Sequence, residues 1–230
     1  MVRIYRSEAV VFDLDDLLYK EFDFMRSAFW EIAQEVTRND AKELFRMMMA
    51  QYFSGNSVLT WVHEVYLENN AKYSLSGLIS QYRNHIPRIT LTAQTKQLLD
   101  NLKENGNKIG ILTDGRSITQ RNKIRALGLE KWVDKISISE ECGNEKPSEK
   151  PYMAFQETFA GGSFVYLADN FAKDFIAPKN LGWRTIALLD NGLNIHSTGS
   201  KIEDKFRPDE EVNDLSEIVV MPFSESYGSI

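Results

Sequence analysis

The chain has 230 residues, of which 43% are hydrophobic and 26% charged, and its formal net charge is −6. This composition is typical of a soluble globular protein with one large α/β domain, or with a core and a smaller second domain. The negative charge disfavours a nucleic-acid polymer or an anionic membrane as the main partner. A single cysteine excludes an internal disulfide. No apolar run approaches the about 20 residues of a membrane span, and the N-terminus lacks a signal-peptide pattern, so we expect a cytoplasmic protein.

The first predicted element is a short buried strand that ends in acidic residues. Residues 9–12 form an apolar run, which predicts a strand covered on both faces. Asp13, Asp15 and Asp16 follow immediately. Carboxylates gathered at the end of a buried strand repel one another, and a hard cation such as Mg²⁺ would offset this repulsion. The alternative is an acidic turn that binds nothing.

A helical segment follows the first strand. Apolar residues recur at helical spacing in four stretches, which span residues 22–36, 44–52, 58–65 and 75–82. Short connections between them predict a small antiparallel four-helix bundle. We therefore expect a helical insertion over residues 18–87, with residues 1–17 and 88–230 forming the core.

After Pro87, predicted helices and strands alternate. Helices are expected from Thr92 to Gly106 and over 118–127, 150–159 and 173–181; strands are expected over 108–113, 135–139, 164–167 and 184–189. Such alternation predicts a parallel sheet with right-handed crossovers, so the fold class is α/β. The tail is expected to contain a polar loop over 197–208, a short helix over 214–218 and a short strand at 219–220.

Polar residues follow the first four of the predicted core strands. Besides Asp13 and Asp15, the set contains Thr113, Asp114, Gly115, Lys146, Asp169, Asn170 and Asp174. Parallel strands bring their carboxyl ends to one edge of the sheet, where ligands bind in open α/β folds. Several carboxylates, a hydroxyl and a lysine form a composition suited to Mg²⁺-assisted chemistry on a phosphate.

The same segments resemble a known family. They read Asp13-Leu-Asp15-Asp16, Thr113-Asp-Gly, Gly143-Asn-Glu-Lys146-Pro and Ala168-Asp169-Asn-Phe-Ala-Lys-Asp174. In this order they resemble the four motifs of the haloacid dehalogenase superfamily, and the resemblance covers nearly the whole chain. It implies a Rossmann-like core with a mobile cap, and a helical insertion between the first two motifs matches the first cap type of that family.

The resemblance also implies roles for these residues. Asp13 would be the nucleophile that forms an aspartyl-phosphate, and Asp15 would protonate the leaving oxygen and later activate water. Asp13 and Asp169 would bind Mg²⁺ through their side chains and Asp15 through its backbone carbonyl, with Asp174 in support. True haloacid dehalogenases lack an acid two residues after the nucleophile, so Asp15 favours cleavage of phosphate esters.

The phosphoryl group would be held by the remaining motif residues. Thr113 would donate a hydrogen bond to it, aided by the N–H groups of Asp114 and Gly115. Lys146 would hold the phosphate and Asp13 together and offset their repulsion. The same residues could have structural roles, since Thr113 could cap a helix and Lys146 could be an exposed loop lysine.

We therefore expect a Mg²⁺-dependent phosphohydrolase of a small phosphomonoester, such as a nucleotide monophosphate, a sugar phosphate or phosphoglycolate. A phosphosugar mutase of the same family and a non-catalytic binding protein on the same core are the alternatives. The substrate-specific contacts are expected in the helical segment, near Tyr19, Phe22, Met25 and Arg26. The sequence leaves the oligomeric state open.

Overall fold

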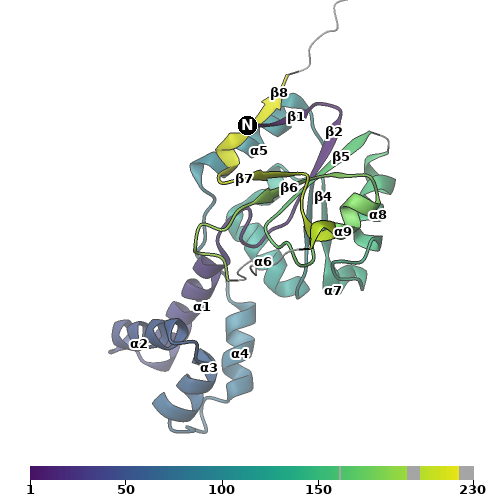
Figure 1. Ribbon diagram of the computed structural model, residues 1–230. Coiled ribbons are helices and arrows are strands. Elements are labelled where there is room, and N and C mark those ends of the chain that lie inside the picture. The colour runs from purple at the N-terminus through teal and green to yellow at the C-terminus, as the bar shows by residue number, and fades with distance from the viewer. Residues whose placement is uncertain (161, 196–202, 223–230) are drawn as a thin grey trace, which may run out of the picture.

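The core of the protein is a six-stranded parallel sheet, as seen in a computed structural model that describes residues 1–160, 162–195 and 203–222 (Figure 1). The strand order is β4–β3–β2–β5–β6–β7, and every neighbouring pair is parallel. The strands are β2 (Glu8–Phe12), β3 (Ile109–Thr113), β4 (Lys135–Ile138), β5 (Ser163–Ala168), β6 (Arg184–Leu188) and β7 (Glu210–Val212). The predicted α/β class with a parallel Rossmann-like core is confirmed.

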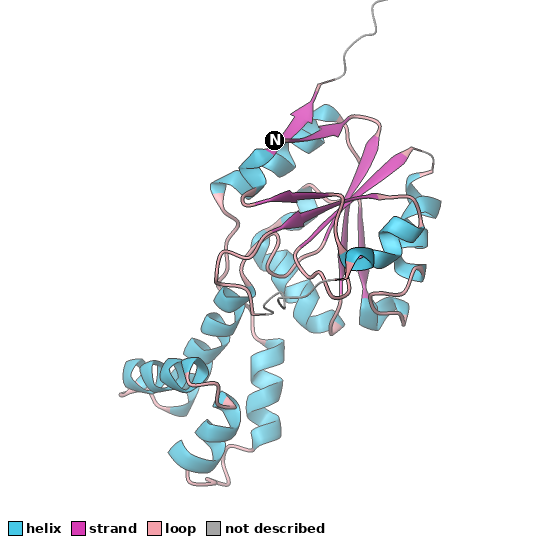
Figure 2. Cartoon of the chain, in the orientation of Figure 1, coloured by secondary structure: helices cyan, strands magenta, loops and turns pink. Residues whose placement is uncertain are grey.

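Helices cover both faces of this sheet (Figure 2). They are α5 (Ala93–Asn105), α6 (Ser117–Leu127), α7 (Ser139–Cys142), α8 (Lys150–Phe159) and α9 (Ile176–Asn180). Val10 packs in one hydrophobic cluster with residues of α5 and α6, whereas Val11 packs in another with residues of α8 and α9. Successive side chains of a strand point to opposite faces, so the continuous apolar run of β2 fits a strand covered on both sides.

The chain leaves the core after β2 and forms a separate group of helices. These are α1 (Glu21–Val36), α2 (Ala41–Phe53), α3 (Val58–Trp61), the π-helical turn Val62–Tyr66 and α4 (Leu75–Asn84). Their apolar faces enclose a hydrophobic cluster of their own, centred on Ile32, Leu44 and Met48. In Figure 1 this group projects from one end of the core. The arrangement fits the predicted helical insertion, and its boundaries at 18 and 87 stay a prediction.

Two short strands lie apart from the main sheet. β1 (Val2–Tyr5) pairs in parallel with β8 (Ile218–Met221) as a two-stranded sheet. β8 overlaps the strand expected at 219–220, whereas β1 and β7 were not expected. The short helix expected at 214–218 is a 3-10 turn over Leu215–Glu217. Further 3-10 turns span Leu129–Lys131 and Asp204–Phe206. The latter lies in the expected 197–208 loop, of which 197–202 is outside the described residues.

The helix expected at 173–181 is shorter than predicted. Asp174 accepts a hydrogen bond from the backbone N–H of Asn170 at 3.1 Å, which stabilises a turn before the helix. α9 therefore begins at Ile176 and places Pro178 in its first turn, where the missing N–H leaves no helical hydrogen bond broken. In the described part of the chain, no helix is long and apolar enough to cross a membrane.

Candidate active site

The carboxyl ends of β2, β3 and β5 meet at a polar pocket. Its lining residues are Asp13, Asp15, Asp16, Glu21, Thr113, Asp114, Lys146, Asp169, Asn170 and Lys173. All but Glu21 follow the strands or lie in loops of the core; Glu21 is the first residue of α1. The parallel sheet has thus brought together residues that are up to 160 positions apart in the sequence, from Asp13 to Lys173.

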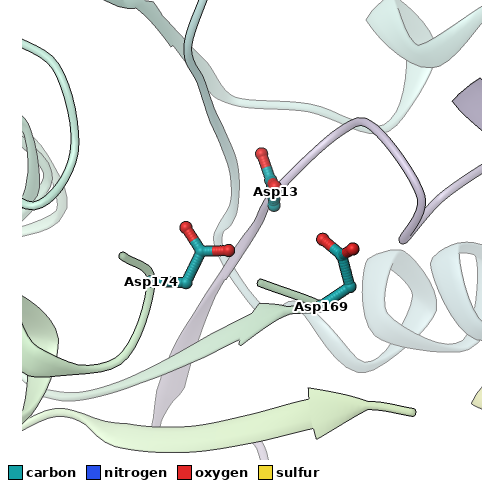
Figure 3. A group of neighbouring side chains, drawn as sticks. All are labelled: Asp13, Asp169 and Asp174. Atoms are coloured by element: carbon teal, nitrogen blue, oxygen red, sulfur yellow. The ribbon is translucent and has the colours of Figure 1, made fainter. Parts of the chain in front are cut away.

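Three buried carboxylates lie close together here, two of which, Asp13 and Asp169, line the pocket (Figure 3). Asp13, Asp169 and Asp174 each offer a ligand atom, and these atoms lie within 4.8 Å of one another. Burial raises the pKa of Asp13 to about 7, and the nearby carboxylates of Asp174 and Asp15 add to the effect against the opposing charge of Lys146. Burial and the charges of Asp13 and Asp174 raise the pKa of Asp169 to about 8. Burial first, and neighbouring negative charge second, disfavour the ionised carboxylates, and a bound cation would offset both costs.

Lys146 reaches the same cluster from the loop before α8. Its Nζ atom lies 3.0 Å from Asp13 Oδ1 and 2.8 Å from Asp174 Oδ1, and its side chain is only 1% exposed. Nζ also donates to the Tyr166 hydroxyl at 3.2 Å. Burial lowers the pKa of a lysine, but the two carboxylates outweigh it and hold the pKa of Lys146 well above its ordinary value. The lysine is therefore a buried cation between two carboxylates and not an exposed loop residue.

The residues after β3 are fixed by hydrogen bonds. The Asp114 carboxylate accepts a hydrogen bond from the Lys146 backbone N–H at 3.1 Å. It also forms an ion pair with Lys173 at 3.1 Å. The buried hydroxyl of Thr113 lies 2.6 Å from Gln120 Nε2. Thr113 and Asp114 line the pocket. The N–H of Gly115, which was expected to face a phosphate, donates to Ser139 Oγ at 2.9 Å.

Asp15 is surrounded by hydrogen-bond donors that motif reasoning did not identify. Lys123 Nζ lies 2.7 Å from Asp15 Oδ1, which also accepts a short hydrogen bond from the Tyr19 hydroxyl. Gln120 Nε2 lies 2.9 Å from Asp15 Oδ2. Burial alone would raise the pKa of Asp15, but Lys123 and these hydrogen bonds lower it below its ordinary value. These contacts fix the position of the Asp15 side chain.

Asp16 joins the helical group to a loop beside the carboxylates. Its backbone is left-handed, with φ of 56°, and its Oδ1 accepts from the N–H of Glu21 at 2.9 Å. Its Oδ2 accepts from the N–H of Ile195 at 3.0 Å. The preceding residue of that loop, Asn194, donates to Asp169 Oδ2 at 3.0 Å and accepts from Lys20 Nζ at 2.5 Å. One loop therefore contacts both the start of α1 and a candidate metal ligand.

Comparisons with known proteins agree with this geometry. The model of the family described as haloacid dehalogenase-like hydrolase matches residues 10–188, which is most of the chain. The chain belongs to the haloacid dehalogenase-like hydrolase family. The resemblance predicted from the four motifs is thereby confirmed.

Two relatives of this haloacid dehalogenase-like hydrolase are phosphatases by name. The chain is 26% identical over 225 residues to glyceraldehyde 3-phosphate phosphatase of Methanocaldococcus jannaschii, covering 92% of this chain and 95% of the relative. It is 27% identical over 139 residues to ribulose-1,5-bisphosphate 5-phosphatase of Halopiger xanaduensis, covering 58% and 57% of the two chains.

Solved structures of the family share the fold. A HAD phosphatase from Thermococcus onnurineus aligns with a TM-score of 0.57 at 19% identity, covering 91% of this chain and 95% of that one. A HAD family hydrolase from Deinococcus radiodurans aligns with a TM-score of 0.61 at 19% identity, covering 91% and 92%. At this level of identity the alignments support the overall fold and not the substrate.

Some residues expected to contact substrate have other environments in this hydrolase. Met25 is buried in the core of the helical group, because it lies on the inner face of α1. Tyr19 is buried against Asp15, and Arg26 pairs with Asp23 at 3.1 Å. Phe22 packs against Tyr52 on α2, with 5.9 Å between the ring centroids. Among the residues that line the pocket, Glu21 is the one contributed by the helical group.

Proposed function

We propose that this protein is a magnesium-dependent phosphatase that cleaves a small phosphomonoester through an aspartyl-phosphate on Asp13. The observation that carries the proposal is the surroundings of Asp13. Its buried carboxylate lies 3.0 Å from Lys146 Nζ and within bridging reach of Asp169 and Asp174. Asp15, two residues along the same loop, lines the same pocket. A nucleophile, an acid–base group and a compensating cation thus lie together.

The chemistry of the proposed reaction follows from these positions. Asp13 attacks phosphorus, and Asp15 gives a proton to the leaving oxygen. Asp15 then takes a proton from the water that hydrolyses the aspartyl-phosphate. Thr113 donates a hydrogen bond to the transferring group, and Lys146 offsets the repulsion between this group and Asp13. These roles suit residues whose side chains face one buried polar pocket.

The carboxylate cluster fits a Mg²⁺ ion. Asp13, Asp169 and Asp174 would hold it, with the backbone carbonyl of Asp15 as a further oxygen ligand. The fit rests on the separation of the ligand atoms, which lie within 4.8 Å of one another, and on the raised pKa values of Asp13 and Asp169. When bound, the ion would neutralise part of the negative charge on the phosphoryl group.

We propose a phosphorylated metabolite of a few carbon atoms, of the glyceraldehyde 3-phosphate kind, as the substrate. The relative that covers nearly all of this chain is named for that compound. The helical group stands at the sheet end that carries the pocket, and Glu21 of α1 lines that pocket, which favours a small substrate over a phosphoprotein. Two relatives named as phosphatases favour transfer to water over transfer to a sugar.

A phosphoester panel tests the proposal. Wild-type protein should release inorganic phosphate from at least one small phosphomonoester, and EDTA should abolish the release until Mg²⁺ is restored. The variant Asp13→Asn should lose this activity and remain folded. The matched control is Asp40→Asn, which changes an exposed carboxylate at the start of α2 and should behave as wild type. No Mg²⁺-dependent release from any ester, or an isomerised sugar phosphate without release, would refute the phosphatase assignment.

A further inference from the structure

We propose that Lys123 and Tyr19 are positioning residues that fix the Asp15 carboxylate so that only its Oδ2 atom takes part in proton transfer. This inference rests on the proposed function, since it assigns the proton-transfer atom of the same reaction. It concerns α6, a helix outside the four motifs, and the connection that leads into α1. The argument depends on the number of donors at each oxygen of Asp15.

The two oxygens of Asp15 have different numbers of donors. Oδ1 accepts from Lys123 Nζ at 2.7 Å and from the Tyr19 hydroxyl. An ionised carboxylate has about four acceptor positions, two on each oxygen, so these two donors saturate Oδ1. Oδ2 accepts from Gln120 Nε2 alone among the hydrogen bonds of the described residues, at 2.9 Å. One acceptor position on Oδ2 is left for a proton of the substrate or of water.

The contact of Gln120 with Oδ2 is also readily exchanged. The same Nε2 atom lies 2.6 Å from Thr113 Oγ1 and 2.9 Å from the carbonyl oxygen of Asp114. An amide nitrogen has two hydrogens, so three acceptors share two donors. If the leaving group approaches Oδ2, Gln120 can keep its two other partners. Oδ2 is therefore the open side of the carboxylate, and Oδ1 is the anchored side.

Lys123 is buried, so its charge needs a paired carboxylate. Its side chain is 3% exposed, and its Nζ atom lies 4.4 Å from the centroid of the Phe24 ring. Glu21 Oε1 also lies 3.5 Å from Nζ. A lysine is rarely buried unless its charge is paired, and here the nearer carboxylate is that of Asp15. A surface ion pair on the same helix, between Arg121 and Glu141 at 2.6 Å, has no such burial.

The anchoring of Asp15 affects both proton transfers of the proposed reaction. In the first step, Asp13 forms a bond to phosphorus, and the ester P–O bond breaks with its electron pair on the leaving oxygen. That oxygen takes a proton from Asp15 Oδ2, which holds the proton gained from water in the second step of the previous turnover. In the second step, water forms a bond to phosphorus, gives a proton to Oδ2, and the bond from phosphorus to Asp13 breaks. Both transfers use Oδ2, so a misplaced carboxylate slows both. An aryl ester with a good leaving group avoids only the first requirement.

The test compares Lys123→Met and Tyr19→Phe with Arg121→Met as the control, on p-nitrophenyl phosphate and on glycerol phosphate with Mg²⁺. For Lys123→Met we expect kcat on glycerol phosphate to fall roughly 10- to 100-fold with little change in KM. On p-nitrophenyl phosphate, the ratio of the burst rate to the steady-state rate should rise roughly 10-fold over wild type, because only hydrolysis is slowed. Tyr19→Phe should show the same pattern with a smaller loss, and the control should match wild type.

Two outcomes overturn the inference. One is an equal loss on both esters with an unchanged burst ratio, which is what a loss of folded protein would produce. The other is wild-type kinetics in a folded Lys123→Met. If Lys123→Met does not fold, as judged by thermal unfolding, Tyr19→Phe decides by the same two measurements. Failure of the proposed function is separate, since it would appear as wild-type protein that has no Mg²⁺-dependent activity on either ester.

Discussion

Lys146→Met should destabilise the protein strongly, because it removes the cation between two buried carboxylates. Nζ lies 3.0 Å from Asp13 Oδ1 and 2.8 Å from Asp174 Oδ1. At an effective dielectric constant of about 20, each contact corresponds to roughly 5–6 kcal/mol of Coulomb attraction. Much of this offsets the cost of burying the charges, so the net loss from leaving the carboxylates unpaired is about 3–5 kcal/mol. The phosphatase activity should fall by at least about 100-fold.

Urea unfolding in EDTA at pH 5 and at pH 8 measures the stability effect. The pKa of Asp13 is raised to about 7, so the folded state favours its protonated form and loses stability as the pH rises from its unfolded pKa through 7. Removing Lys146 raises that pKa further. The difference in unfolding free energy between wild type and variant should therefore be larger at pH 8, where Asp13 is ionised in wild type, than at pH 5.

Two further variants give the controls. Lys173→Met removes an ion pair at the pocket rim whose lysine is 34% exposed, and it should cost about 1 kcal/mol or less. Asp174→Asn added to Lys146→Met should restore part of the lost stability, because it removes one of the two uncompensated charges. The reasoning is refuted if Lys146→Met is as stable as wild type at pH 8, or if the two substitutions simply add.

Three further results are expected. Gly110→Ala should cost about 1–3 kcal/mol in urea unfolding, because its Cβ would lie 2.5 Å from an atom of the Phe155 ring; a wild-type midpoint would contradict this. The rise in melting temperature caused by Mg²⁺ should be larger at pH 8 than at pH 6. At the lower pH, protons compete with the ion for Asp13, with a pKa of about 7, and for Asp169, with a pKa of about 8. The opposite trend would exclude these two residues as ligands. Asn194→Ala removes the 3.0 Å hydrogen bond to Asp169 Oδ2, so the Mg²⁺ concentration for half-maximal activity should rise about 10-fold, with kcat at saturating Mg²⁺ nearly unchanged.

The central strand and its acidic end could be predicted because their pattern is local. The run of apolar residues in β2 requires burial on both faces, and the sheet order does place β2 between β3 and β5. The motif order then indicated which strand ends meet. By contrast, Val2 and Ile4 alternate with exposed residues over a strand of four residues, so β1 is too short to be separated from a loop by its pattern. Its pairing with β8 depends on contacts across the whole chain.

The environment of Asp15 could not be predicted from the sequence. Gln120 and Lys123 are 105 and 108 residues away from it, on a helix whose polar residues read as solvent-facing. The sequence contains a weak indication that these two side chains are buried. Gln120 and Lys123 are three residues apart on α6, and the buried Leu127 lies on the same face of the helix. A polar pair on the inner face of a helix that follows a motif strand indicates a buried partner. Which partner it is depends on the fold.

The loop after β6 couples the position of α1 to cation binding at Asp169. Asp16 accepts from the N–H groups of both Glu21 and Ile195, and the neighbouring Asn194 contacts Asp169. If a ligand favours the present placement of α1, it also favours the present placement of Asp169. Thermodynamic reciprocity then requires that a cation at Asp169 strengthen the binding of that ligand by the same factor by which the ligand strengthens cation binding. Affinities for the two should therefore be measured together.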